Sequence, residues 1–344
     1  MRAVVLDHYG DADTRAAAAA VAAIPDTGQG FDDAALLTAA ARLAPAWDYP
    51  LVCGSGLDGQ PEVLARLGRE RVMLGNPPSI QCQFRDPRHF FEWLDRCRIP
   101  YPEVRFQRPR DPAGWLIKSG CSEGGKRVRF CAHHEAAPGD YFQRHIEGAA
   151  HSALFLANGE SARLLGINTL WTLDRGETPF LFAGAMSHPL PQHPLTGTLS
   201  GWLDRLARAT GLVGLGSLDF VLDRRGQPQV LEVNARPSAT LALHDPDYAE
   251  GLLAAHVRAC RSGQLVDIAP ARQIRAFRVA LAPRTMTLPA DIRWPAWVAD
   301  RPMPGTRCEA GQPLCTVLAA TPNPAATLAQ LARRHHRLNA LLPP

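Results

Sequence analysis

Short apolar runs bounded by glycine and proline mark the first part of the chain. Three of them predict β-strands, at residues 2–6, 50–56 and 71–78. An alanine-rich segment after the first run predicts a helix, for which Asp13 or Thr14 would be the N-cap. Strands that alternate with helices in this way indicate a small parallel α/β domain, which Pro77 and Pro78 end.

The next part mixes helical and strand patterns. An amphipathic helix is expected from Arg85 or Asp86, with Phe90, Leu94 and Cys97 on one face. WLIKSG (115–120) and KRVRF (126–130) predict two strands joined by a glycine-rich loop. Further strands are expected at 141–148, 152–159, 166–173 and 180–184. The strand at 152–159 is expected to form a hairpin with the strand at 141–148. A helix is expected at 199–210.

Residues 216–238 predict a β-hairpin with an Arg-Gly turn. Strict alternation in its second strand would place Val230, Glu232 and Asn234 on one face and Leu231 and Val233 on the other. From about residue 265 the segments become short and rich in arginine, proline and tryptophan, which indicates another small domain. The predicted division is therefore 1–78, 79–264 and 265–344.

The composition narrows the class of protein. Apolar residues make up 46% and charged residues 20% of the 344-residue chain, which excludes a disordered chain or a fibre. The longest apolar run, Ala16–Ile24, is too short to span a membrane, and Asp7 interrupts the only early apolar segment. Eight scattered cysteines without a C-x-x-C pair are typical of free thiols in a cytoplasmic protein. A net charge of +4 gives no reason to expect nucleic acid, and we expect no membrane partner.

Lysine is almost absent from this arginine-rich chain. Of 37 basic residues only Lys118 and Lys126 are lysines, and they flank one glycine-rich stretch. Lysine carries a compact point charge on a slim stem, whereas arginine is a broad planar fork. This favours a pair of phosphate-contacting ammonium groups over the alternative, two solvated surface lysines.

The hairpin carries the second chemical signal. Alternation places Glu232 and Asn234 on one face, and Asp219 on the facing strand can lie beside them. Oxygen donors that converge in this way are costly unless a hard cation binds them. A set of only three ligands suits a Mg²⁺ ion that nucleotide phosphates also bind. Arg236 on the same face could stabilise a developing oxyanion or acyl phosphate.

The order and spacing of these elements resemble the ATP-grasp superfamily. The matching segments are WLIKSGCSEGGKRV for the phosphate loop, YFQRHIEG for the hinge under adenine, and GSLDFVLDRRGQPQVLEVNARPS for the magnesium hairpin. The resemblance covers residue 86 to about 246. It implies an α/β (α+β) ATP-grasp fold, with an N-terminal parallel α/β pre-grasp domain and a small C-terminal capping domain around residues 300–319.

The resemblance also implies a role for each site residue. It implies that Lys118 contacts the phosphates of ATP, with Lys126 at the far end of the loop, and that Gly124 and Gly125 let backbone amides approach them. Gln143 would meet the adenine amino group, and the backbone of His145 or Ile146 would complete the recognition of adenine. The implied Mg²⁺ ligands are Asp219, Glu232 and Asn234, and Arg236 would face the transferred phosphoryl and acyl groups.

Three positions depart from the pattern of the superfamily. A lysine common before the first grasp helix falls near Pro87, so Arg85 or Arg88 would substitute. The ribose-binding glutamate falls at Ala150 or His151. Glu123 places negative charge in the phosphate loop.

The sequence therefore predicts an ATP- and Mg²⁺-dependent, ADP-forming carboxylate–amine ligase that works through an acyl phosphate. Within the superfamily it looks most like ligases of one-carbon cofactor (methanofuran or tetrahydromethanopterin) biosynthesis, such as tyramine–glutamate ligase. The partners would be a small carboxylate, for example glutamate, and an amine. Two alternatives stay open: a carboxylase-type enzyme and a non-catalytic nucleotide-binding protein.

Overall fold

The computed structural model describes residues 4–7, 15, 18–24, 31–45, 50–54, 56–57, 60–120, 124–190 and 193–343. Within them the chain forms two compact units. The larger comprises Leu51–Leu64 and Met73–Ala271, and the smaller comprises Met1–Pro50, Ala65–Val72 and Arg272–Pro344. The three-part division of the sequence stays a prediction.

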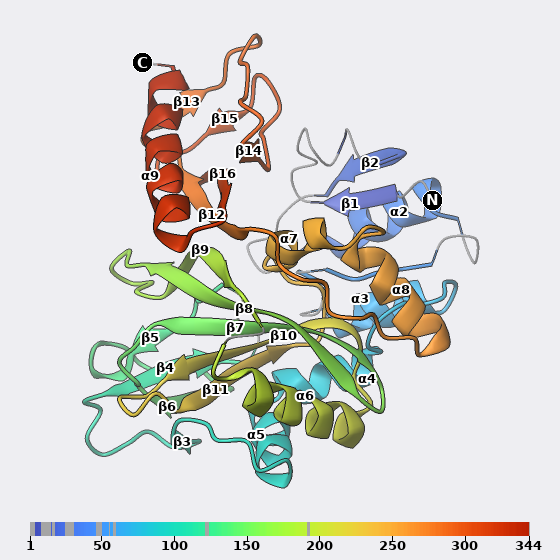
Figure 1. The fold of residues 1–344 in the computed structure, drawn as a ribbon, viewed down its shortest axis with the longest axis vertical. Helices are drawn as coiled ribbons and strands as arrows, with labels where there is room; N and C mark the ends of the chain where they lie inside the picture. Colours follow the sequence, from blue (N-terminus) through green and yellow to red (C-terminus); the bar gives the residue numbers. More distant parts are fainter. Residues whose placement is uncertain are drawn as a thin grey trace. The chain divides into compact units, whose positions relative to one another are not determined.

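A twisted antiparallel sheet forms the centre of the larger unit (Figure 1). Its strands run in the order β11-β10-β7-β8-β9. Their bounds are β7 Ala150–Asn158, β8 Ala162–Leu173, β9 Leu181–His188, β10 Val213–Leu222 and β11 Pro228–Asn234. Helix α6 (Thr196–Thr210) packs against β7 and β8, whereas α8 (Leu252–Ser262) packs against β7 and β10. Each helix buries a separate apolar cluster, so both faces of the sheet are covered.

A second, smaller sheet has the order β3-β6-β4-β5. Its strands are β3 (Val104–Arg105), β4 (Trp115–Ser119), β5 (Arg129–Phe130) and β6 (Asp140–Arg144), and η1 (Cys131–His133) follows β5. Its antiparallel register pairs Leu116 with Gln143 and Lys118 with Tyr141. These four residues therefore share one face.

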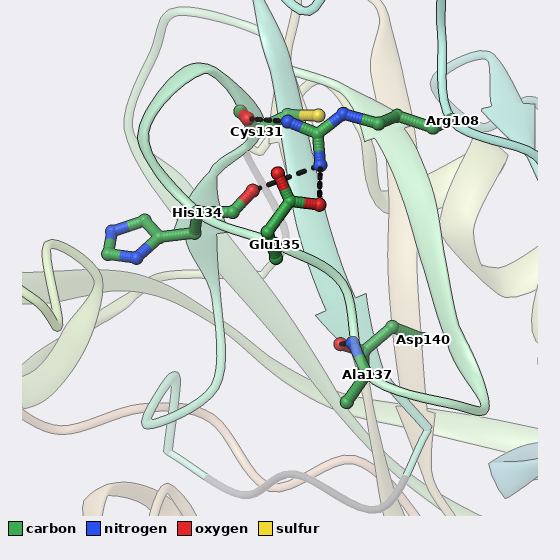
Figure 2. A network of polar contacts seen from close by, with 6 residues as sticks. All are labelled: Arg108, Cys131, His134, Glu135, Ala137 and Asp140. Atoms are coloured by element: carbon green, nitrogen blue, oxygen red, sulfur yellow. Dashed lines mark hydrogen bonds and ion pairs between the residues drawn. The ribbon is translucent and has the colours of Figure 1, made fainter.

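Arg108 holds the connection between β5 and β6 in place (Figure 2). Its guanidinium donates to the carbonyls of Cys131 at 2.9 Å and His134 at 3.1 Å, and to the carboxylate of Glu135 at 3.1 Å. Cys131 is fully buried against Trp115, Ile117 and Phe142. This connection is thus fixed by a planar five-donor group, which a lysine could not replace.

The helices that lead into this unit are α3 (Pro61–Gly68), which continues into the smaller unit, α4 (Pro78–Arg85) and α5 (Pro87–Arg96). Asp86 caps α5 by accepting hydrogen bonds from the amides of Arg88 and His89. Phe90, Leu94 and Cys97 are buried as the spacing predicted. After β11 come α7 (Leu241–His244) and η2 (Asp245–Asp247).

The smaller unit contains a parallel pair, β1 (Val4–Asp7) with β2 (Ala20–Ala23), and helix α2 (Asp33–Leu43). Its C-terminal part has β12 (Ile274–Leu281), β16 (Pro313–Thr321) and β14 (Val298–Ala299) in antiparallel order, and α9 (Pro324–Leu341) packs on β12 and β16. Two short strands, β13 (Met286–Thr287) and β15 (Arg307–Cys308), form a separate pair. No helix within the described ranges is both long and apolar enough to cross a membrane.

Three expectations for the elements were wrong. Ala20–Ala23, inside the predicted alanine-rich helix, is a strand because it pairs in parallel with β1; the proposed caps Asp13 and Thr14 lie outside the described residues. The described residues of the runs at 50–56 and 71–78 form one isolated parallel bridge, between Leu51 and Met73, in place of two strands. Strand β7 pairs with β8 and β10, not with β6, which lies in the smaller sheet.

The face assignment of the hairpin was wrong at Val230. The register shifts between the Asp219–Glu232 pair and the Phe220–Val230 pair, so Leu231 is the extra residue of a β-bulge. Val230 and Val233 therefore both point into the core with Leu218 and Phe220. Glu232 remains beside Asp219 on the opposite face.

Candidate functional site

The two carboxylates predicted as metal ligands meet across the β10–β11 hairpin. Asp219 is the register partner of Glu232, and Ser217 that of Asn234. Asn234 Nδ2 lies 3.4 Å from Asp219 Oδ2 and 3.4 Å from Glu232 Oε1. The structure thus brings all three predicted side chains together.

Two carboxylates lie side by side in this cluster. Burial and the adjacent Glu232 carboxylate raise the pKa of Asp219 well above its usual range, although the charges of Arg236 and Lys118 oppose the shift. An amide nitrogen is the one donor shown between the two carboxylates. A hard divalent cation fits this place better, since the Asn234 amide can turn to offer its oxygen. Among the described residues no group of three His, Cys, Asp or Glu side chains could hold a metal ion, so a cation here would rely on two carboxylates and the Asn234 amide.

Lys118 lies buried on the smaller sheet. Its Nζ donates to Gln143 Oε1 at 3.1 Å and stands 5.9 Å from the ring centroid of Tyr141. The Lys118 ammonium and the Glu232 carboxylate both act on the Tyr141 hydroxyl, whose pKa is raised mainly by burial. Lys118 therefore faces the carboxylate hairpin, as a phosphate-binding lysine beside a metal site would.

Gln143 is 1% exposed, and its amide is oriented by its neighbour. Because an ammonium can only donate, Oε1 must face Lys118. Nε2 is left buried without a hydrogen-bond partner. The residue therefore offers a donor rather than an acceptor, which suits a ring nitrogen or an oxygen of a ligand and not the adenine amino group.

The segment after β6 was predicted to complete the adenine site. The His145 amide already donates to the Gly114 carbonyl at 2.9 Å, so backbone recognition is left to the His145 carbonyl and to Ile146. The His145 ring lies 5.4 Å from that of Phe130 and 5.7 Å from that of Phe180, and burial lowers its pKa. An apolar wall thus borders the segment.

The glycine loop lies against the start of β9. Gly124 O accepts from the Phe182 amide at 2.9 Å, and a Cβ on Gly125 would stand 2.0 Å from Phe180 O. Both glycines have positive φ, 59° and 75°. Gly125 is therefore required for this close approach. Lys126 is exposed, and Glu123 lies outside the described residues.

Arg236 follows the cluster of Asp219, Glu232 and Asn234 in the chain and is buried. It is positioned by a residue that the sequence reasoning missed, Asn76. Asn76 Nδ2 donates to the carbonyls of Val213 and Ala235 at 2.9 Å each, and Oδ1 accepts from the Val213 amide at 2.9 Å. The only sequence signal was an asparagine between a glycine and two prolines. This side chain fixes the backbone between Asn234 and Arg236.

The structure also shows where two of the positions that depart from the superfamily pattern lie. The backbone of Arg85 lies against the start of the phosphate loop, since a Cβ on Gly120 would stand 2.0 Å from Arg85 O, whereas the Arg88 guanidinium lies over the Phe106 ring, 4.1 Å from its centroid. His151 stacks on Phe220 at 5.4 Å between ring centroids, on the core side of the sheet. Arg85 is therefore the better candidate for the missing lysine.

A family model matches part of the chain. Residues 84–240 match the family model for the ATP-grasp domain, somewhat under half of the chain. No curated protein sequence matches the chain.

Several solved structures share the fold. The biotin carboxylase domain of 2-oxoglutarate carboxylase from Hydrogenobacter thermophilus, solved with MgADP, ADP and bicarbonate, has a TM-score of 0.75 at 13% identity, over 97% of this chain and 84% of that one. Biotin carboxylase from Campylobacter jejuni, in a β,γ-ATP complex, has a TM-score of 0.73 at 11% identity, over 97% and 85%. Pyruvate carboxylase from Rhizobium etli has 0.73 at 13%, over 97% of this chain but 36% of that one. The chain has the ATP-grasp fold.

Proposed function

We propose that this chain is an ATP- and Mg²⁺-dependent ligase that joins a carboxylate to an amine through an acyl phosphate. The observation that carries the proposal is the cross-strand pair Asp219–Glu232, bridged by Asn234 and faced by buried Lys118. A protein that only binds nucleotide has no need of a second acidic ligand. The set suits a reaction in which positioning and neutralisation of phosphate charge do most of the work.

In this proposal each group has one task. Asp219, Glu232 and Asn234 would hold Mg²⁺, which supplies neutralising charge to the phosphates when bound. Lys118 donates to phosphate oxygens, and the Gly124–Gly125 backbone with Lys126 covers them. Gln143 Nε2 and the backbone at His145 and Ile146 hold the base. Arg236 stabilises charge on the acyl phosphate, whose carbon the amine then attacks.

The substrates are proposed at the level of class. The carboxylate is an amino acid such as glutamate and the amine a small primary amine, in the cytoplasm, as in one-carbon cofactor biosynthesis of the tyramine–glutamate ligase kind. The carboxylase-type alternative is favoured by one observation: the similar solved structures are biotin carboxylases, one of them with bicarbonate.

The test is release of ADP with MgATP and a panel of acids: amino acids, cofactor precursors and bicarbonate, each with and without ammonium or a primary amine. ADP release that depends on an organic acid and an amine supports the ligase. Release stimulated by bicarbonate alone supports the carboxylase. Nucleotide binding without any acid-dependent turnover supports the non-catalytic protein and ends our proposal. Glu232→Gln, which changes a proposed metal ligand, should lose this ADP release. Glu160→Gln, which changes an exposed carboxylate in the β7–β8 turn, is its control and should keep it.

A further inference from the structure

A small cavity lies beside Arg236, wholly within the larger unit. Its lining comes from Cys53, from residues 73–76, from Gln81 of α4, from residues 235–237 and from His256 of α8. It has room for about one molecule of the size of water. The cavity thus adjoins Arg236, the residue whose side chain we place at the acyl carbon.

Two of the polar side chains that line it have their hydrogen bonds made. Asn76 bonds to the backbone of Val213 and Ala235 through both ends of its amide. His256 Nδ1 accepts from the Leu215 amide at 2.9 Å, and Nε2 donates to the Leu74 carbonyl at 2.9 Å. Neither residue needs a ligand.

Gln81 does need one. It is 5% exposed, and its Nε2 donates to the Asn76 carbonyl at 2.9 Å. Because a carbonyl only accepts, the amide cannot be turned round without placing two oxygens together. Oε1 is left buried with no hydrogen-bond partner among the described residues. A buried acceptor of this kind calls for an N–H or O–H donor.

We propose that this cavity is the subsite for the attacking amine and that Gln81 Oε1 accepts one of its N–H bonds. The inference rests on the proposed ligase function. The size of the cavity favours ammonia or the unsubstituted end of a primary amine. The positive charge of Arg236 favours the neutral, nucleophilic form over the ammonium ion.

The lone pair of the amine nitrogen forms a bond to the acyl carbon, and the bond from that carbon to the phosphate oxygen breaks. The phosphate leaves with the electron pair and takes one proton from the nitrogen, which gives an amide and hydrogen phosphate. Gln81 holds and orients the amine but does not act as a base, since a neutral amide oxygen is too weakly basic.

The experiment compares Gln81→Met with Gln83→Met, which lies two positions on in the same helix and does not line the cavity. With the acid that gives most ADP release, the amine concentration for half-maximal product is measured for ammonia, methylamine and dimethylamine. We expect Gln81→Met to raise it by about fivefold or more for ammonia, because one hydrogen bond to the amine is lost. Gln83→Met should not raise it, and dimethylamine should be the poorest substrate. The affinity for MgADP controls for folding.

A second measurement does not depend on turnover. The thermal midpoint is followed at pH about 9 with ammonium chloride against potassium chloride of equal ionic strength. Wild type should gain more from ammonium, and Gln81→Met should show no difference. If product forms but Gln81→Met keeps the wild-type amine dependence, the cavity holds only water and the subsite is wrong, while the ligase stands. If no acid supports turnover, the proposed ligase function is wrong. If wild type and Gln81→Met also respond identically to the two salts, the proposed amine subsite is wrong as well.

Discussion

Lys118 offers the sharpest perturbation of the nucleotide site. The chain uses arginine at almost every other basic position, and this lysine is buried between Gln143 and the Tyr141 ring. Lys118→Met removes the ammonium, whereas Lys118→Arg keeps the charge on a broader head group. We expect both variants to bind MgATP poorly, because the slot fits a slim stem and a point charge.

The magnitude follows from the contacts. A hydrogen bond to a charged group contributes about 1.5–3 kcal/mol, so loss of one such bond to phosphate weakens binding by about 10- to 100-fold. In the free protein Lys118→Met also leaves Gln143 Oε1 buried without its donor, a cost of about 1–3 kcal/mol. Part of that cost is offset, because Lys118→Met also removes the cost of burying the Lys118 ammonium. The effect on binding should therefore exceed the effect on stability.

Isothermal titration calorimetry with MgATP measures the affinity directly, and thermal unfolding checks the fold. Lys126→Met gives the comparison within the same loop: Lys126 covers the phosphates from an exposed position, so its loss should weaken the affinity much less than loss of Lys118, by no more than about threefold. A wild-type affinity in Lys118→Arg would refute the argument that this position requires lysine. A wild-type affinity in Lys118→Met would remove the residue from the site.

Three further predictions concern the hairpin, its support and the half-buried His188. Glu232→Gln should keep the thermal midpoint, because the side chain is exposed, but lose ADP release; turnover within a few-fold of wild type at saturating Mg²⁺ would contradict the ligand assignment. Asn76→Ala removes three hydrogen bonds and should lower the free energy of unfolding by about 2–4 kcal/mol in denaturant titrations, and a loss below about 1 kcal/mol would show that the bonds are not needed. Burial and nearby histidines lower the pKa of His188 to about 4 from 6.5, so the folded protein keeps it neutral. The stability it contributes is present above pH 6.5 and is lost as the pH falls toward 4; an NMR titration midpoint near 6.5 would disprove the shift.

The sequence predicted those parts of the fold in which local pattern and tertiary contacts agree. The helix after Asp86 formed as expected because its N-cap, its spacing and its burial all coincide. Ala20–Ala23 did not form the expected helix, because parallel pairing with β1 overrides the helical preference of alanine there. Pairing between distant strands, such as β7 with β10, leaves no local signal.

Some features of the candidate site could likewise be predicted from the sequence, and others could not. Asp219 and Glu232 could be placed together because a hairpin has a fixed register, and the bulge at Leu231 moved only Val230 to the other face. The orientation of the Gln143 amide could not be predicted, since it depends on Lys118 from another strand. Asn76 bonds to Val213, and Gln81 lines a cavity together with Arg236; each of these partners lies more than a hundred positions away in the sequence.

The central claim is that an acyl phosphate forms and that Arg236 stabilises it. The most direct measurement is trapping with hydroxylamine, using MgATP and the acid panel, on wild type, on Arg236→Ala and on the exposed control Arg208→Ala. The account predicts a hydroxamate with an organic acid in wild type and the control. In Arg236→Ala it predicts a rate lower by about 10²–10³, with the nucleotide affinity little changed. A wild-type rate in Arg236→Ala, or ATP binding with no hydroxamate from any acid, would contradict it.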